Sequence, residues 1–216
     1  MNFELSTFNF QLSTLDVVGA AIGLVFVFSE YKASRWLWPS SLLMAAFYAV
    51  INFRIGWYAN MGICLYNFAI SIYGILVWRG IIQGRGRKSE VGNNASDLRP
   101  PTSDLQERSI GSCPLRYWPW LIAATAALTL LFYWLLPLLG ESTLPWLDGL
   151  SAALGIVGMW MLSQKYWQQW LFWLVSEPIL AYIYFTTGYT ASAVMYVVYE
   201  VFVILGIIRW KKESIS

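Results

Sequence analysis

Seven apolar stretches divide this chain, and each comes close to the length that a membrane-crossing helix requires. A crossing helix needs about 20 apolar residues. Charged residues make up only 12% of the 216 residues, against about 25% in a typical soluble domain. The sequence therefore predicts an all-α integral membrane protein with seven transmembrane helices. The stretches lie at 13–31, 38–53, 57–78, 117–139, 146–163, 168–187 and 190–209.

Positive charge is distributed unevenly over the segments between these stretches. When the segments are assigned alternately to the two sides, every Lys and Arg except Arg54 falls on one side. Because segments rich in Lys and Arg face the cytoplasm, we expect an external N-terminus and a cytoplasmic C-terminus. The segment 79–116 is rich in charge, Gly, Pro and Ser, which predicts a cytoplasmic linker.

Composition also argues against several functional classes. The chain has no His, and its two cysteines, Cys64 and Cys113, fall in an apolar stretch and in the linker. A metal site or a structural disulfide is therefore not expected, and no motif indicates a cofactor. The net charge of +2 gives no support for nucleic-acid binding. The expected partners are the lipid bilayer and a small-molecule substrate.

The two ends of the chain repeat one another at a shift of 132 residues without a gap. This register predicts a first three-helix repeat at 13–78, a connector helix at 117–139 and a second repeat at 146–210. An odd unit followed by an odd connector leaves both units in the same orientation, so the predicted architecture is a parallel 3+1+3 repeat. Paired repeats of this kind build transporters whose site lies between the units. The matched pairs are Gly23/Gly155, Trp38/Trp170, Phe53/Phe185, Gly56/Gly188, Ala59/Ala191, Gly74/Gly206 and Trp78/Trp210.

An acidic residue stands inside the sixth apolar stretch. With 100° per residue on a helix, Trp170, Trp173, Glu177 and Tyr184 share one face. An acid facing lipid is costly, and such residues usually mark a pathway or a binding site. This face predicts a polar or cationic substrate handled within the membrane. The plainer interpretations are an interfacial aromatic belt for the indoles and a protonated, helix-packing role for the acid.

Further candidates lie in the third and seventh stretches. Glu200 shares a face with Tyr196 and is a second candidate substrate contact, although this face can instead meet a neighbouring helix. Asn67 and Ser71 form a mildly polar stripe that serves either the substrate or helix packing. A rival from another class is a membrane-embedded enzyme with Glu177 and Glu200 as an acid–base pair. The lack of His and of a nucleophile motif argues against it, and no catalytic residue is expected.

Several short motifs together resemble the Pnu family of vitamin transporters. This resemblance implies an architecture like that of full-length SWEET sugar transporters, a bacterial inner-membrane location and a homotrimer. It also implies facilitated diffusion by alternating access, with nicotinamide riboside as the best-known substrate. The motifs that carry it are Trp57-Tyr58-Ala59, Tyr73-Gly74 with Trp78, Trp170-x-x-Trp173, and the spacing of Gly206 to Trp210.

The chain also departs from the family pattern at positions that bear on the substrate. Glu177 stands where nicotinamide riboside carriers typically have Asn, and Cys64 and Ser71 stand where they usually have Gln and Asn. Other members of the family carry thiamine, which is also an aromatic cation. A carboxylate and tryptophans suit such a ligand through charge and cation–π attraction. Nicotinamide riboside leads on the resemblance, and thiamine is the alternative.

Overall fold

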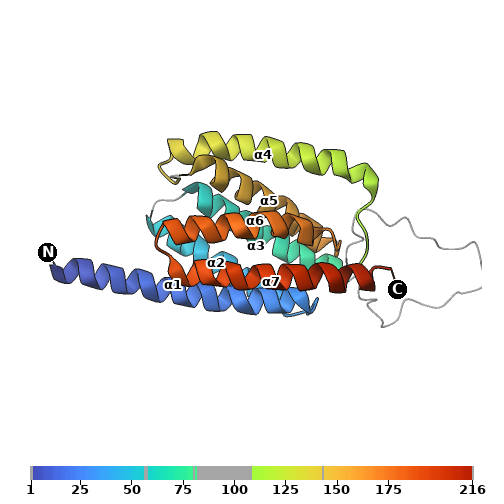
Figure 1. Ribbon diagram of the computed structural model, residues 1–216, viewed down its shortest axis with the longest axis horizontal. Coiled ribbons are helices and arrows are strands. Elements are labelled where there is room, and N and C mark those ends of the chain that lie inside the picture. The colour runs from blue at the N-terminus through green and yellow to red at the C-terminus, as the bar shows by residue number, and fades with distance from the viewer. Residues whose placement is uncertain (1, 56–57, 80, 82–108, 143, 216) are drawn as a thin grey trace, which may run out of the picture.

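The computed structural model describes residues 2–55, 58–79, 81, 109–142 and 144–215, which contain seven α-helices and one short 3-10 helix. The helices run along a common axis, and α1 begins at the opposite end of the bundle from the end of α7 (Figure 1). Their bounds are α1 Asn2–Tyr31, α2 Leu37–Ile55, α3 Tyr58–Trp78, η1 Leu115–Tyr117, α4 Trp118–Leu138, α5 Pro145–Ser163, α6 Gln169–Thr186 and α7 Thr190–Glu213.

Most helix ends lie within two residues of the apolar stretches, but α1 starts eleven residues earlier than 13–31. The chain contains no Gly or Pro before Gly19, so nothing in the backbone stops the helix where the apolar pattern starts. The last turn of α7 carries Lys211 and Lys212, and cations are favoured at a helix C-terminus. Helix formation therefore continues past the hydrophobic segments at both ends of the chain.

Four described helical segments are long and apolar enough to cross a membrane: Tyr58–Trp78, Leu115–Leu138, Pro145–Ser163 and Thr190–Glu213. Shorter apolar segments, Val17–Tyr31 and Leu37–Val50, lie in α1 and α2. The remaining helix, α6, contains Gln, Glu, Ser and Pro as well as apolar residues, which lowers its mean hydropathy. All seven expected helices are present, and the sixth carries the buried polar residues Gln169, Ser176 and Glu177.

Six helices pack in a ring, and the seventh lies outside it. Around the ring, α1 contacts α2, α2 contacts α3, α3 contacts α5, α5 contacts α6, α6 contacts α7, and α7 contacts α1. Helix α4 packs on α5 on the outer side of this ring (Figure 1). The first three helices thus meet the last three at two places, α1 with α7 and α3 with α5.

The turns that follow α1 and α5 have the same backbone geometry. Ala33 has φ 51° and Lys165 has φ 53°, both in the left-handed region. The N–H of Ala33 donates to the carbonyl of Glu30 at 2.9 Å, and the N–H of Lys165 donates to the carbonyl of Leu162 at 2.9 Å. A left-handed conformation is uncommon for residues other than Gly, and here it recurs at two positions 132 residues apart.

Two tryptophan pairs occupy corresponding positions near these turns. Trp38 meets Trp78 edge to face at 5.3 Å and 85°, and Trp170 meets Trp210 at 5.7 Å and 85°. All four side chains are buried. Edge-to-face packing is a favoured arrangement for aromatic rings because their quadrupoles are then complementary. Each pair joins the second and third helices of its unit.

A glycine makes room for one ring of each pair. A Cβ at Gly74 would lie 2.3 Å from the Trp38 ring, and a Cβ at Gly206 would lie 2.5 Å from the Trp170 ring. Neither position has space for a larger residue unless an indole moves. Both glycines are therefore close-packing positions.

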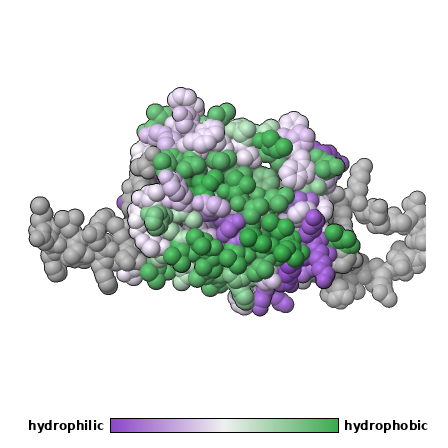
Figure 2. Space-filling view, viewed as in Figure 1, coloured by the Kyte–Doolittle hydropathy of each residue, from purple (hydrophilic) through white to green (hydrophobic). Residues whose placement is uncertain are grey.

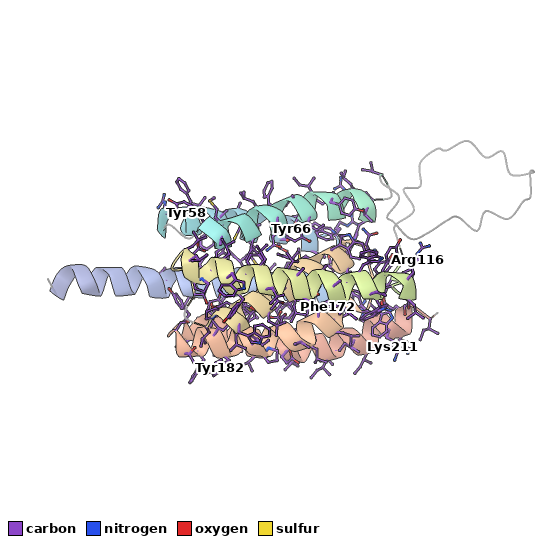
Figure 3. The ribbon with its side chains drawn as sticks, turned by 90° about the horizontal axis from the view of Figure 1, so that it is seen from above. Tyr58, Tyr66, Arg116, Phe172, Tyr182 and Lys211 are labelled. Carbon is purple, nitrogen blue, oxygen red and sulfur yellow. The ribbon has the colours of Figure 1, made fainter. Side chains whose placement is uncertain are left out.

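The outer surface separates into apolar and charged regions. Apolar residues cover the middle of the face shown in Figure 2, and hydrophilic residues gather towards the end where α7 finishes. Arg116 and Lys211 lie at that end, whereas Tyr58 and Tyr182 lie at the other (Figure 3). We call the first the basic end. Arg54, in the last turn of α2, lies at the opposite end of the bundle.

Candidate functional site

A buried polar cluster joins α1 to α6 and α7. The carboxyl of Glu30, fully buried, accepts a hydrogen bond from Trp173 Nε1 at 2.8 Å and another from the hydroxyl of Tyr199. Trp173 Nε1 also donates to Gln169 Oε1 at 2.6 Å. We call these four residues the Glu30 cluster. Hydrogen bonds are what make a buried acid tolerable in a low-dielectric interior.

Glu177 lies one turn after Trp173 on α6, and only one of its two carboxyl oxygens has a hydrogen-bond partner among the described residues. Its Oε1 accepts from the hydroxyl of Ser176 at 3.1 Å, whereas its buried Oε2 has no hydrogen-bond partner among the described residues. The charged groups that act on it are Glu30 and Glu200, which are also acids. None of these three acids forms an ion pair with a described Lys or Arg, so a positive charge placed among them would be stabilised.

Aromatic side chains continue the site along α6 and α7. The rings of Tyr184 and Tyr196 stack at 5.2 Å with 14° between their planes, and Tyr189 meets Tyr184 edge to face at 6.0 Å. Tyr196 also lies within electrostatic range of Glu177. The structure therefore brings Trp173, Glu177, Tyr184 and Tyr196 into one line between α6 and α7.

Glu200 is half-buried on α7. Its Oε2 is buried and has no hydrogen-bond partner in the described structure. It lies within electrostatic range of Glu177. Glu200 therefore borders the line of site residues and adds negative charge to it.

Trp170 has a different environment from Trp173. It is fully buried, with its ring against Gly206 and edge to face with Trp210. Its Nε1 has no hydrogen-bond partner among the described residues. These ring contacts pack α6 against α7. The position of Trp170 corresponds to that of Trp38 in the first unit. The two motif tryptophans therefore have different surroundings, and of the two only Trp173 belongs to the Glu30 cluster.

Asn67 and Ser71 lie on α3, and Ser71 belongs to a contact between α2 and α3. The Ser71 hydroxyl donates to the carbonyl of Asn67 at 2.6 Å and lies 2.7 Å from the hydroxyl of Ser41. Ser71 is fully buried and Asn67 is half-buried. None of the hydrogen bonds found in the described residues connects this pair to the Glu30 cluster.

Sequence reasoning missed Glu30, Gln169 and Tyr199. Glu30 stands two residues before Lys32 at the end of an apolar stretch, a place typical of an interfacial charge. The signal that the sequence offered is the repeat register. Glu30 lies one turn before Ala33, and the counterpart of Ala33 in the second unit, Lys165, lies just before the start of α6. Among the described residues, no group of three or more His, Cys, Asp or Glu is arranged to hold a metal ion.

A ring of apolar helices enclosing unpaired acids is the architecture of a membrane transporter rather than of a soluble binding protein. The chain belongs to the nicotinamide mononucleotide transporter family, whose model matches residues 13–212. It is similar to a solved structure described as the crystal structure of the vitamin B3 transporter PnuC, with 23% identity and a TM-score of 0.66. That match covers 99% of this chain and 87% of the other.

These comparisons confirm the resemblance to the Pnu family and identify a multi-pass membrane protein of a transporter family, not of an enzyme family. At 23% identity, the solved structure shows a shared fold. The substrate, the oligomeric state and the orientation in the membrane are matters for proposal.

Proposed function

We propose that this protein is a bacterial inner-membrane uptake transporter for a small aromatic cationic vitamin, with nicotinamide riboside as the leading substrate. The observation that carries this proposal is the buried Oε2 of Glu177, which has no hydrogen-bond partner among the described residues, lies within electrostatic range of Glu30 and Glu200 and forms no ion pair with a described Lys or Arg. A cationic substrate would supply the missing positive charge. Membership of a nicotinamide mononucleotide transporter family supports the substrate class.

In this proposal each residue of the site has a separate role in substrate binding. Glu177 attracts the cationic ring, and Glu200 adds negative potential beside it. The aromatic faces of Trp173 and Tyr196 border the ring and contribute cation–π attraction, which is worth about 2 kcal/mol or more when desolvated. Glu30 and Gln169 hold the Trp173 indole by its N–H, so that the ring is oriented before substrate arrives.

Thiamine is the alternative substrate. Glu177 favours it, because a carboxylate can both attract a cation and accept hydrogen bonds from an amino group. Charge alone does not separate the two vitamins, since both are aromatic cations. Uptake assays with both compounds are therefore part of the test.

Transport itself would use the two three-helix units, 13–78 and 146–210, as parallel halves that rock about the site, with 117–139 as the connector and 79–116 as a cytoplasmic linker. The ring contacts of α1 with α7 and α3 with α5, and the matching turns at Ala33 and Lys165, support this division. We further propose facilitated diffusion, an external N-terminus and the homotrimer implied by the family. Most of the linker lies outside the described residues.

The test is uptake of radiolabelled nicotinamide riboside and thiamine into proteoliposomes. The wild type should equilibrate one vitamin across the vesicle membrane without an ion gradient. Glu177→Gln should lower the initial rate of that uptake about tenfold or more, since a hydrogen bond to a charged group contributes about 1.5–3 kcal/mol. The matched control is Glu213→Gln, which makes the same chemical change in an exposed ion pair at the end of α7. Unchanged uptake in Glu177→Gln would remove the proposed role of this carboxyl.

The same vesicles test the enzyme alternative with Glu177 and Glu200 as an acid–base pair. A transporter returns the labelled vitamin chemically unchanged, so chromatography of the vesicle contents should show the substrate alone. A new labelled product made by the purified protein would contradict the proposal.

A further inference from the structure

A surface pocket of about 220 Å³ opens between the start of α2 and the end of α3, at the basic end of the bundle. Arg35 and Arg79 line it together with the indoles of Trp36, Trp38 and Trp78, and no acidic residue contributes to its wall. Both arginines are exposed. Neither forms an ion pair with any residue that the structure describes. Among the described residues, the pocket is therefore a cationic, indole-lined site to which no carboxylate is paired.

The corresponding position in the second unit is closed. A shift of 132 residues replaces Arg35 by Trp167 and Arg79 by Lys211. There the Lys211 ammonium lies 5.4 Å from the centre of the Trp167 ring, and Trp167 Nε1 donates to the hydroxyl of Ser112 at 3.1 Å. One cation and one aromatic ring contact each other there, whereas the two cations of the first unit form no ion pair with a described residue.

A segment of the chain covers this second position. The N–H of Gly111 donates to the carbonyl of Lys165 at 3.0 Å, and its carbonyl accepts from the N–H of Trp167 at 3.1 Å. The N–H of Cys113 donates to Gln168 Oε1 at 2.9 Å. Within the described ranges, no segment makes such contacts with the turn before α2. The first unit therefore presents an open counterpart of a position that the second unit fills internally.

The chemistry of the open pocket fits a phosphate group. A guanidinium is planar and binds phosphate oxygens through two parallel hydrogen bonds, and two guanidiniums on one wall can hold one dianionic or monoanionic group. Tryptophan is enriched at the level of lipid headgroups, and Trp36 beside the pocket is 69% exposed. We propose that this pocket binds the phosphate of an anionic phospholipid headgroup at the membrane edge.

Binding of lipid by the purified full-length protein tests this proposal. Native mass spectrometry in detergent would count bound phosphatidylglycerol and, for comparison, zwitterionic phosphatidylcholine. Each of Arg35→Gln and Arg79→Gln should weaken phosphatidylglycerol binding about fivefold, as expected for one basic residue near a headgroup, whereas phosphatidylcholine binding should stay low. Arg79→Lys keeps the charge but loses the two parallel hydrogen bonds, so it should bind phosphatidylglycerol more tightly than Arg79→Gln and less tightly than the wild type, and it guards against a misfolded Gln variant.

The matched control is Lys211→Gln, which removes one charge at the corresponding position of the second unit. Its phosphatidylglycerol binding should equal that of the wild type. An equal loss in Lys211→Gln, or no loss in either arginine variant, would overturn the proposal. Glycerol 3-phosphate, a soluble phosphate ester, tests the source of the phosphate. If it displaces phosphatidylglycerol at equal concentration, the pocket binds a soluble ligand and the lipid proposal is overturned; if it does not, the lipid proposal is supported.

Discussion

The two three-helix units can be compared position by position, and they agree at the basic end while they differ inside. Both units contain a left-handed turn residue, a buried tryptophan pair and a glycine that accommodates an indole. The polar site occurs once. The counterparts of Glu30, Trp173, Glu177 and Tyr199 are Leu162, Ser41, Ala45 and Asn67. The repeated residues are thus framework, and the residues present in one copy are the candidates for substrate binding.

This comparison changes the interpretation of the Trp170-x-x-Trp173 motif. Trp170 has a counterpart, Trp38, with the same packing, whereas Trp173 has Ser41 at its corresponding position. We therefore expect Trp170 to belong to the framework and Trp173 to the site. Substitutions at corresponding positions of the two units test this division between framework residues and site residues.

Trp170→Ala and Trp38→Ala should both destabilise the protein by about 3–5 kcal/mol, because each removes a fully packed indole from a tight contact. Denaturation in detergent, followed by intrinsic fluorescence, would measure the loss. Equal losses in the two variants fit a shared packing role. Wild-type stability together with abolished uptake in Trp170→Ala would instead make this indole a substrate contact.

Trp173→Phe keeps an aromatic ring but removes the N–H that Glu30 and Gln169 accept. The loss should be about 1–3 kcal/mol, the cost of leaving a buried acceptor unpaired, and uptake of the transported vitamin should fall as well. Ser41→Ala, at the corresponding position, should leave uptake near that of the wild type. The division fails if both variants reduce uptake to the same extent.

Gly206→Ala and Gly74→Ala should each cost about 1–3 kcal/mol, because the new methyl group overlaps an indole that has no room to move. Gly155→Ala is the control, since a Cβ there meets nothing within 4 Å, and it should be neutral or slightly stabilising in a helix. Thermal melting of the three variants would measure the difference. Similar melting temperatures for all three would mean that the Trp38 and Trp170 indoles can shift to accommodate a methyl group at little cost in stability.

Glu141 provides a contrast at the other end of the bundle. Its carboxylate accepts from the backbone N–H groups of Ala59 and Asn60 at 2.8 and 3.0 Å, and thereby caps α3, whereas the N-cap residue of α7, Tyr189, makes no side-chain capping bond. Glu141→Ala should cost about 1–2 kcal/mol and raise amide hydrogen exchange in the first turn of α3. Exchange in the first turn of α7 should not change.

Cys113 reports on the segment that covers the second unit. Burial raises the pKa of its thiol from 9.0 to about 11, so the reactive thiolate should be about 100-fold rarer at pH 8 than for an ordinary thiol. Maleimide labelling should be slow at pH 8 and accelerate as the pH rises towards 11. Gln168→Ala removes the hydrogen bond to the Cys113 N–H and should speed labelling; an unchanged rate would mean that the segment is held by other contacts.

The helices were predictable because they depend on local composition. Uninterrupted apolar runs indicate α3 at Tyr58–Trp78 and α5 at Pro145–Ser163 almost to the residue. The start of α1 was missed because hydropathy marks the apolar part of a helix and not its polar extension. The family was predictable from several short motifs in one register, and the family match at residues 13–212 confirms it.

The site was predictable only in part. Glu177 and Trp173 stood out because an acid and an indole within an apolar stretch are conspicuous in sequence. Glu30 did not, because its partners come from α6 and α7 and only the packing of α1 against α7 brings them together. The roles predicted for Trp170, Glu200, Asn67 and Tyr184 remain predictions that uptake measurements would test.

The partners of Glu30 arrive late in biosynthesis. Trp173 is 143 residues further along the chain and Tyr199 is 169 residues further. Because α6 and α7 are the last helices to be synthesised, Glu30 lacks both of these partners until the chain is almost complete. A chain that ends before α6 should therefore carry a Glu30 carboxyl without either hydrogen bond.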